Sequence, residues 1–184
     1  MQDPTRFLGE MLLLLGALGL LAGFVALRFP GAVRAGLERF PRSKAPGWVL
    51  TAAGTFWVGW VIAHAALGRF EAVKPLVPIL AMLSFGAIVY FLDELLAPRA
   101  LGGLLMLLAN PLLNGVRWSD SPWRYAVVLI AYAWVIAGCV LMLHPWAFRK
   151  AAARFAAPGW LRAAGWAKLA GGAILLAAGG ALLR

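Results

Sequence analysis

The sequence YAVVLIAYAWVIAGCVLML, residues 125–143, contains no Asp, Glu, Lys or Arg. Residues 11–27 and 75–92 are free of these charged residues in the same way. Apolar runs of about 17–25 residues match the hydrocarbon thickness of a bilayer, where only helices or closed barrels satisfy the backbone hydrogen bonds. The runs are continuous and do not alternate as barrel strands do, so they predict transmembrane helices.

Composition supports the same class. Of the 184 residues, 63% are hydrophobic and 13% are charged, and the mean hydropathy is +0.84. A soluble domain has about half apolar and a quarter charged residues, so this chain is expected to fold in lipid. The single cysteine, Cys139, excludes an intramolecular disulfide and a cysteine-based metal site.

Six membrane spans fit the chain, joined by connections that hold the Pro, Gly and charged residues expected of turns. The first span is expected to be retained rather than cleaved as a signal peptide, because residues 1–10 carry Asp3 and Glu10 with only one Arg, and no small-x-small cleavage site follows the apolar stretch. We therefore predict an all-α polytopic membrane protein with one transmembrane domain, residues 1–184. The expected spans are 7–29, 47–68, 75–93, 99–116, 124–144 and 160–183.

Lys and Arg are enriched on one side of these spans, which the positive-inside rule places in the cytoplasm. The richer side carries Arg28, Arg34, Arg39, Arg42, Lys44, Arg99, Arg149, Lys150, Arg154, Arg162 and Lys168, and the poorer side carries Arg6, Arg69, Lys74, Arg117, Arg124 and Arg184. We expect a multi-pass protein of the cell inner membrane with both termini non-cytoplasmic. Because the net charge of +10 follows this membrane rule, no nucleic-acid partner is expected.

Two segments of the chain resemble each other. Residues 23–40 align without a gap with residues 138–155, and Ala-Pro-Gly-Trp follows each segment, at 45–48 and 157–160. The alternative is a chance likeness between basic connectors. The match favours a duplication in which two helical hairpins enter the membrane in the same sense, as parallel repeats. The copies would cover about 19–68 and 134–183, with a central hairpin at about 75–116.

The basic connectors at 30–42 and 145–155 are expected to form short amphipathic helices, because apolar residues recur at helical spacing beside the cations. Such helices lie in the headgroup layer and attract anionic lipid. Two interpretations remain open: ordinary anchoring, or a docking surface for a cytoplasmic partner. The basic residues concerned are Arg34, Arg39, Arg42, Arg149, Lys150 and Arg154.

The central hairpin gathers polar groups on and beside the third and fourth spans. Ionisable residues within spans are costly and usually face a bundle interior or a water path, and Pro111 frees a backbone carbonyl nearby. This pattern is compatible with a transport pathway beside a broken helix; the alternative is a solvated cytoplasmic turn. The candidate residues are Tyr90, Asp93, Glu94, Arg99, Asn110 and Asn114.

Small residues are placed for close helix packing. Gly19 and Gly23 form a four-residue step in the first span, while Gly165, Gly172 and Gly179 recur every seven residues in the last. Inside lipid, small residues let helix backbones approach closely. These residues are expected to pack helices within the chain or against another subunit.

The two histidines lie at opposite depths. His64 is near the outer end of the second span and His144 at the inner end of the fifth, so they cannot share one haem or metal. Each could still hold a pigment singly. No phosphate-binding loop, serine-hydrolase motif or zinc motif occurs, and we expect no enzyme, cofactor or metal.

Three functions are therefore compatible with the sequence. The first is a non-catalytic membrane subunit or assembly factor that docks other membrane subunits or a second copy. The second is a small transporter or channel, and the third a pigment- or haem-binding anchor.

Overall fold

The computed structural model describes residues 3–92 and 94–184, and this described part is helical without strands. Six of its helices are long and apolar enough to cross a membrane, as a multi-pass membrane protein requires. They lie within a few residues of the six expected spans. The long helices are α1 (Pro4–Arg28), α3 (Lys44–His64), α4 (Val77–Phe91, preceded by the 3₁₀ helix η2, Gly68–Leu76), α5 (Leu96–Val116), α6 (Arg124–Leu143) and α8 (Pro158–Leu182).

Local chemistry explains several helix ends. The side chain of Asp3 accepts a hydrogen bond of 3.0 Å from the backbone N–H of Thr5, which caps α1. Proline begins α1 and α8, where its missing N–H costs nothing. The second span was expected to continue to residue 68, but α3 ends at His64 and the chain turns through Gly68, whose φ is +55°. Glycine accepts that backbone conformation without strain.

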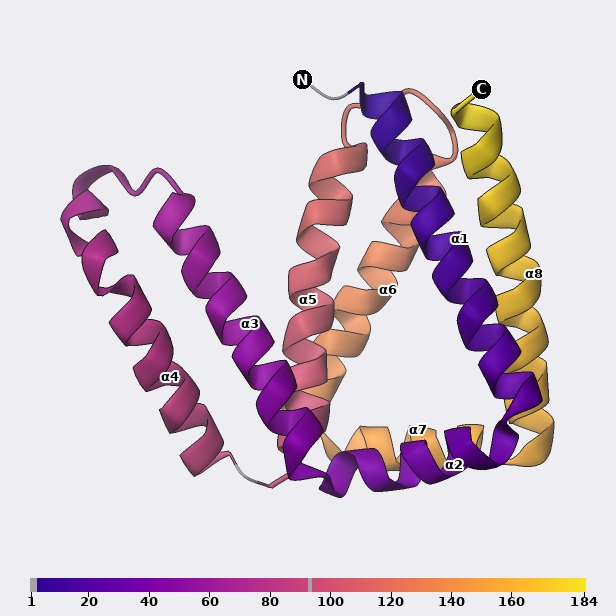
Figure 1. The fold of residues 1–184 in the computed structure, drawn as a ribbon, viewed down its shortest axis with the longest axis horizontal. Helices are drawn as coiled ribbons and strands as arrows, with labels where there is room; N and C mark the ends of the chain where they lie inside the picture. The colour runs from indigo at the N-terminus through magenta and orange to yellow at the C-terminus, as the bar shows by residue number, and fades with distance from the viewer. Residues whose placement is uncertain (1–2, 93) are drawn as a thin grey trace.

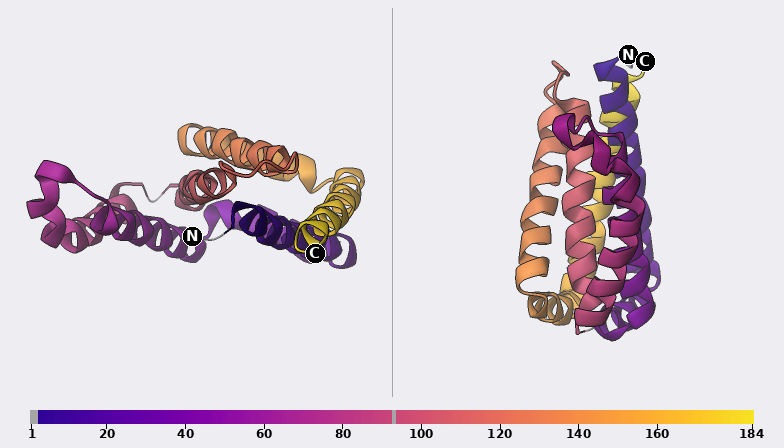
Figure 2. Two further views of the ribbon diagram at one scale, coloured as in Figure 1. Left: turned by 90° about the horizontal axis from the view of Figure 1, so that it is seen from above. Right: turned by 90° about the vertical axis from the view of Figure 1, so that its left-hand side faces the viewer.

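Two short helices join the long ones, as expected of the basic connectors. They are α2 (Pro30–Arg39, continued by the 3₁₀ helix η1, Phe40–Arg42) and α7 (Trp146–Phe155). Both lie across the same end of the molecule and run side by side in opposite directions (Figures 1 and 2). We call this the basic end. The N- and C-termini lie together at the other end (Figure 1).

Helices α1 and α8 form an antiparallel pair in backbone contact (Figure 1). Glycines recur every seven residues on both helices and face each other. In each facing pair, a Cβ added to one glycine would lie 2.8 Å from the carbonyl oxygen of the other. Real Cβ atoms essentially never approach so closely, so only glycine allows this packing. The pairs are Gly9 with Gly179, Gly16 with Gly172, and Gly23 with Gly165.

Helices α5 and α6 form a second antiparallel pair built in the same way. A Cβ added at Gly102 would lie 2.7 Å from the carbonyl oxygen of Gly138, and the reverse distance is 2.6 Å. Seven residues further along the pair, Ala109 and Ala131 are both buried. Small residues at a seven-residue spacing therefore set both helix pairs close together.

The α1–α8 pair and the α5–α6 pair are joined by an apolar core near the end of the molecule where the two termini lie. From there the pairs diverge toward the basic end, where α2 and α7 bridge them (Figure 1). The buried core residues are Leu8, Leu12, Leu15, Ala109, Leu112, Val116, Val127, Ala131 and Ala178.

Helices α3 and α4 form an arm beside this four-helix part (Figures 1 and 2). Helix α3 packs on α5 and on α4, whereas α4 packs chiefly on α3 and η2. The helices of the expected central hairpin therefore follow each other in the chain but pack on different neighbours. Seen from above, the molecule is an elongated, flattened array of helices (Figure 2).

Candidate functional site

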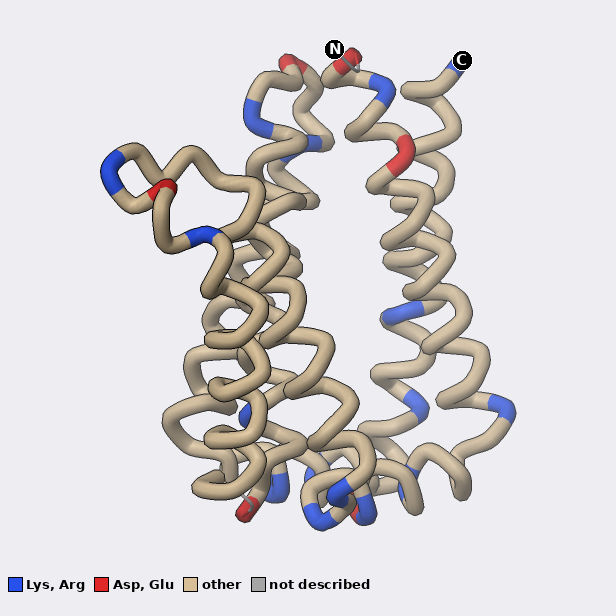
Figure 3. The backbone as a smooth tube through the Cα atoms, turned by 60° about the vertical axis from the view of Figure 1, so that its left-hand side comes forward, with Lys and Arg blue, Asp and Glu red and all other residues tan. Residues whose placement is uncertain are grey.

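The basic end gathers all six basic connector residues named from the sequence. They lie on α2, η1 and α7, and Lys and Arg are dense at this end of the backbone (Figure 3). The ring centroids of Phe40 and Phe148 are 5.1 Å apart and join the two connectors. From the sequence, the connectors are expected to be separate surface helices, whereas in the structure they pack against each other.

Cations at this end lie against aromatic rings as well as in solvent. The Nζ atom of Lys150 is 4.6 Å from the ring centroid of Trp146, and the guanidinium carbon of Arg154 is 5.0 Å from that of Trp160. Tryptophan and cations placed together are typical of a membrane interface. The Nε atom of Arg34 is buried without a hydrogen-bond partner among the described residues.

The polar residues of the central helices do not meet at one place. The side-chain amide of Asn114 donates to Asn110 at 3.0 Å, near the end of α5 that faces away from the basic end. Tyr90, on α4, is 80% exposed, and Glu94 and Arg99 lie near the basic end of α5. Asp93 lies outside the described residues.

Helix α5 also runs through Pro111 as one element, so the expected broken helix is not found. The proline removes one backbone hydrogen bond from the helix, but the helix is not interrupted at this residue. Several transporters bind ions or substrates at the unwound backbone of a broken helix. Helix α5 has no such unwound segment at Pro111.

A large hollow lies where α3, α4 and α5 face one another. Its volume is about 710 Å³, within the range of roughly 300–1,000 Å³ found for ligand pockets. We call it the slot. It is open on one side, and most of its described lining is aliphatic, including Leu50, Ile62, Leu80, Ile88, Leu104 and Leu107.

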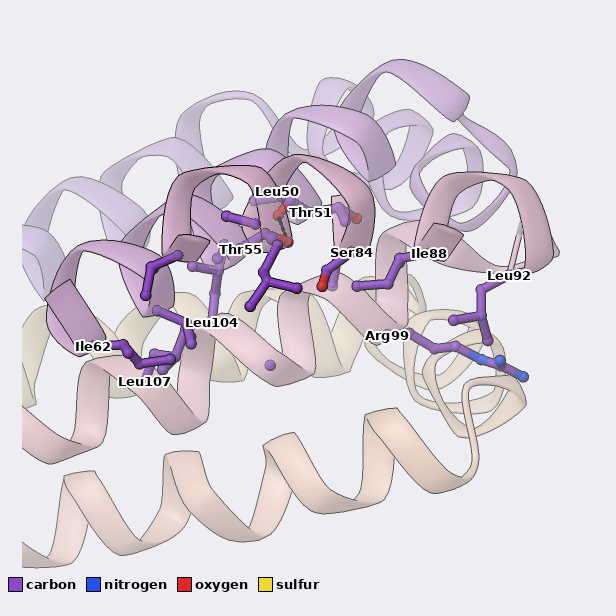
Figure 4. Close-up of a pocket in the computed structure, with 18 of the residues that line it drawn as sticks. Leu50, Thr51, Thr55, Ile62, Ser84, Ile88, Leu92, Arg99, Leu104 and Leu107 are labelled. Carbon is purple, nitrogen blue, oxygen red and sulfur yellow. Dashed lines mark hydrogen bonds between the residues drawn. The ribbon is translucent and has the colours of Figure 1, made fainter. Parts of the chain in front are cut away.

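The hydroxyl groups in the slot wall are largely satisfied by their own helix. Thr51 donates to the carbonyl of Gly47 at 2.7 Å, and Thr55 donates to the carbonyl of Thr51 at 2.8 Å. Figure 4 shows the hydroxyl side chains of Thr51, Thr55 and Ser84 along the wall. A wall whose threonines are already bonded offers little to a polar ligand, so the slot suits an apolar one.

Arg99 is the one charged residue among the described lining of the slot. It lies beside Leu92 at one end, while Ile62 and Leu107 lie at the other (Figure 4). Its Nε atom is buried and has no hydrogen-bond partner among the described residues. Leu96 lines both the slot and a second hollow of about 440 Å³, whose other described lining is Pro41, Arg42, Ser43, Lys44, Glu94, Leu95 and Arg149.

The histidines lie at opposite ends of the long helices. The Nδ1–H of His64 donates to the carbonyl of Trp60 at 2.8 Å, and its ring stacks on Trp60 at 4.5 Å. His144 ends α6 at the basic end, with its ring edge-to-face on Trp146. Within the part of the chain that the structure describes, no three His, Cys, Asp or Glu side chains are grouped to hold a metal.

The five glycines named from the sequence all lie at the α1–α8 interface. Sequence reasoning missed Gly9 and Gly16, although their seven-residue spacing with Gly23 was readable. It also missed the slot, because no motif marks a surface shared by three helices.

Comparison of the chain with protein-family models, with curated proteins and with solved structures gives no match.

Proposed function

We propose that the chain is a non-catalytic integral membrane subunit or assembly factor of the inner membrane, with six spans. Its basic end would face the cytoplasm and both termini the other side. Six helices of sufficient length and apolarity support the spans. The concentration of Lys and Arg on α2, η1 and α7 supports the orientation.

The observation that carries the proposal is the uncovered outer face of α4. Ile79, Leu83, Gly86 and Tyr90 follow one another at steps of three and four residues, which places them on one stripe of the helix. We call this the outer stripe. Its three large side chains are each more than half exposed, and a Cβ added at Gly86 would meet nothing within 4 Å.

A partner helix fits such a stripe better than lipid does. Glycine between larger apolar residues leaves a notch into which another transmembrane helix can pack its backbone closely. Helix α4 needs such support, because within the chain it packs chiefly on α3. The occupant we propose is therefore a transmembrane helix of another membrane protein.

The transport alternative lacks a comparable observation. Its described polar residues lie toward both ends of α5 and on the outer stripe, so they line no common path. The basic end supports docking instead, since two cationic helices packed together present one broad surface to a cytoplasmic partner.

Filling the notch tests the proposal. We expect native mass spectrometry of the wild-type chain, extracted from its own membrane in mild detergent, to show a partner protein at fixed stoichiometry. Gly86→Leu should reduce the amount of that complex at least roughly fivefold, since an overpacked contact costs about 1–3 kcal/mol. Gly171→Leu on α8 is the matched control, because its Cβ also meets nothing within 4 Å.

The control should retain the partner at the wild-type level. Equal retention by both variants would remove the outer stripe as the docking face. A wild-type chain that is monomeric in every mild extraction would contradict the subunit proposal itself.

A further inference from the structure

We propose that the slot binds one acyl chain of an anionic phospholipid, with the phosphate of that lipid held by Arg99. This goes beyond the subunit role, since it assigns a ligand to the opposite face of α4. It rests on the membrane placement proposed above and is independent of any partner protein.

The slot is long enough to hold an acyl chain that reaches into the bilayer from the basic end. Along α4 and its C-cap the slot extends from Val77 to Leu92, which is about 22 Å at 1.5 Å per residue. Beyond the outer end of α3 it is also lined by Leu67, Phe70 and Val73. Half of a hydrocarbon core of about 30 Å is about 15 Å. The slot therefore begins at the basic end and is longer than one leaflet is deep, so an acyl chain anchored at the basic end would fill part of its length.

The wall chemistry fits a hydrocarbon. Most of the described lining is aliphatic, with leucine, isoleucine and valine side chains contributed by α3, α4 and α5. The hydroxyls of Thr51 and Thr55 are bonded to their own helix. Because the slot is partly open, an acyl chain could enter it from the bilayer. An aqueous solute would instead find few groups to bind.

Arg99 supplies the charge complementarity. A guanidinium group within apolar surroundings is costly unless an anion pairs with it, yet its Nε is buried without a hydrogen-bond partner among the described residues. A phosphate oxygen is the acceptor that a guanidinium group binds best, because the two geometries match. This Nε, without a partner among the described residues, marks the headgroup end of the ligand.

The neighbouring hollow extends this headgroup site. It shares Leu96 with the slot and is lined by Arg42, Lys44 and Arg149, against one described acid, Glu94. Basic pockets between transmembrane helices on the cytoplasmic side are typical sites for anionic lipid headgroups. A zwitterionic lipid would gain less, because its own cation would face these basic residues.

Two substitutions test binding of the lipid's acyl chain and binding of its headgroup separately. Gly103 lines the slot and has open space around it, so Gly103→Leu should fill the slot without disturbing the helices. Arg99→Gln should remove the charge alone. Gly171→Leu and Arg28→Gln are the controls. Gly171 does not line the slot, and Arg28 is an exposed cation that ends α1 at the same end of the molecule.

The readout is lipid retained by the full chain in native mass spectrometry. Each variant is reconstituted in vesicles of equal phosphatidylglycerol and phosphatidylcholine and then extracted in mild detergent. Wild type and both controls should keep one phosphatidylglycerol. Gly103→Leu should lose it, and Arg99→Gln should retain roughly fivefold less, the effect of one cation near anionic lipid.

Equal retention by Gly103→Leu and Gly171→Leu would overturn the inference, as would a wild type without preference between the two lipids. A second measurement needs no variant: phosphatidylglycerol with a photoreactive acyl chain is crosslinked to wild-type protein. Excess phosphatidylcholine should leave labelling of tryptic peptide 100–117 unchanged while reducing that of peptide 169–184. Equal competition at both peptides would also refute the site.

Discussion

Replacing Gly172 by alanine should lower the free energy of unfolding by about 1–3 kcal/mol, the usual cost of forcing a methyl group into a packed contact. The new Cβ would lie 2.8 Å from the carbonyl oxygen of Gly16 and 2.8 Å from the backbone nitrogen of Leu20. Both are backbone atoms, so no side chain can rotate away and the two helices must separate. Separation would reduce contact along the whole α1–α8 seam.

The adjacent residue gives the matched control for this effect. Gly171→Ala places its Cβ in open space, and alanine favours a helix over glycine by up to about 1 kcal/mol. Its stability should therefore be unchanged or higher. Unfolding by SDS titration in mixed micelles, followed by tryptophan fluorescence, measures both variants. A loss of the same size at both positions would show that α1 and α8 do not meet through this seam.

Truncating Leu12 to alanine should also cost about 1–3 kcal/mol, by leaving a cavity. Leu12 is 0% exposed in the core that joins the α1–α8 pair to the α5–α6 pair. In water-soluble cores such a change costs about 2–5 kcal/mol, part of which is transfer from water. A lipid tail is as apolar as leucine, so only the packing part remains here.

Leu14→Ala is the control, because Leu14 is 52% exposed on the same helix. It loses an equal number of carbon atoms but leaves no cavity, and its unfolding free energy in the same titration should lie within about 0.5 kcal/mol of wild type. If Leu14→Ala proved as costly as Leu12→Ala, the core described here would not be the contact that joins the two helix pairs.

The spans could be predicted because each rests on a local property. An uncharged apolar run long enough to cross a membrane is visible without knowledge of its neighbours, and six such helices are present. The α3 boundary was wrong by a few residues, since apolar residues continue past His64 while Gly68 turns the backbone.

Helix pairing could not be predicted in the same way, because it depends on residues far apart in the chain. The seven-residue glycine spacing in α8 was evident, but its meaning needed the matching spacing of Gly9, Gly16 and Gly23 on α1. The four-residue step from Gly19 to Gly23 drew attention instead. Nothing local indicates that the first and last helices are antiparallel partners.

In the candidate site, too, local features could be predicted from the sequence, whereas contacts between distant segments could not. The basic connectors were predicted correctly as short helices, while their mutual packing through Phe40 and Phe148 depends on the whole fold. The polar cluster was predicted because its residues lie on or beside two helices that are consecutive in the chain. In the structure, however, α4 packs on α3, and α5 packs chiefly on α6. Arg99 then becomes part of a slot that three helices share. The proposed internal duplication stays a prediction.

Measuring the orientation of the basic end is the most direct test, since docking of a cytoplasmic partner and the cytoplasmic lipid site both depend on it. In a Cys139→Ala background, Gly36→Cys on α2 and Asp120→Cys between α5 and α6 each supply one exposed thiol at opposite ends. Losing an acid should not change the topology, because Asp and Glu contribute little to it.

An impermeant maleimide would be applied to intact right-side-out spheroplasts that express each variant. We predict labelling of the cysteine at position 120 before lysis, and of the one at position 36 only after lysis. Labelling of position 36 in intact spheroplasts, with position 120 protected, would contradict the proposed topology and the cytoplasmic lipid site with it.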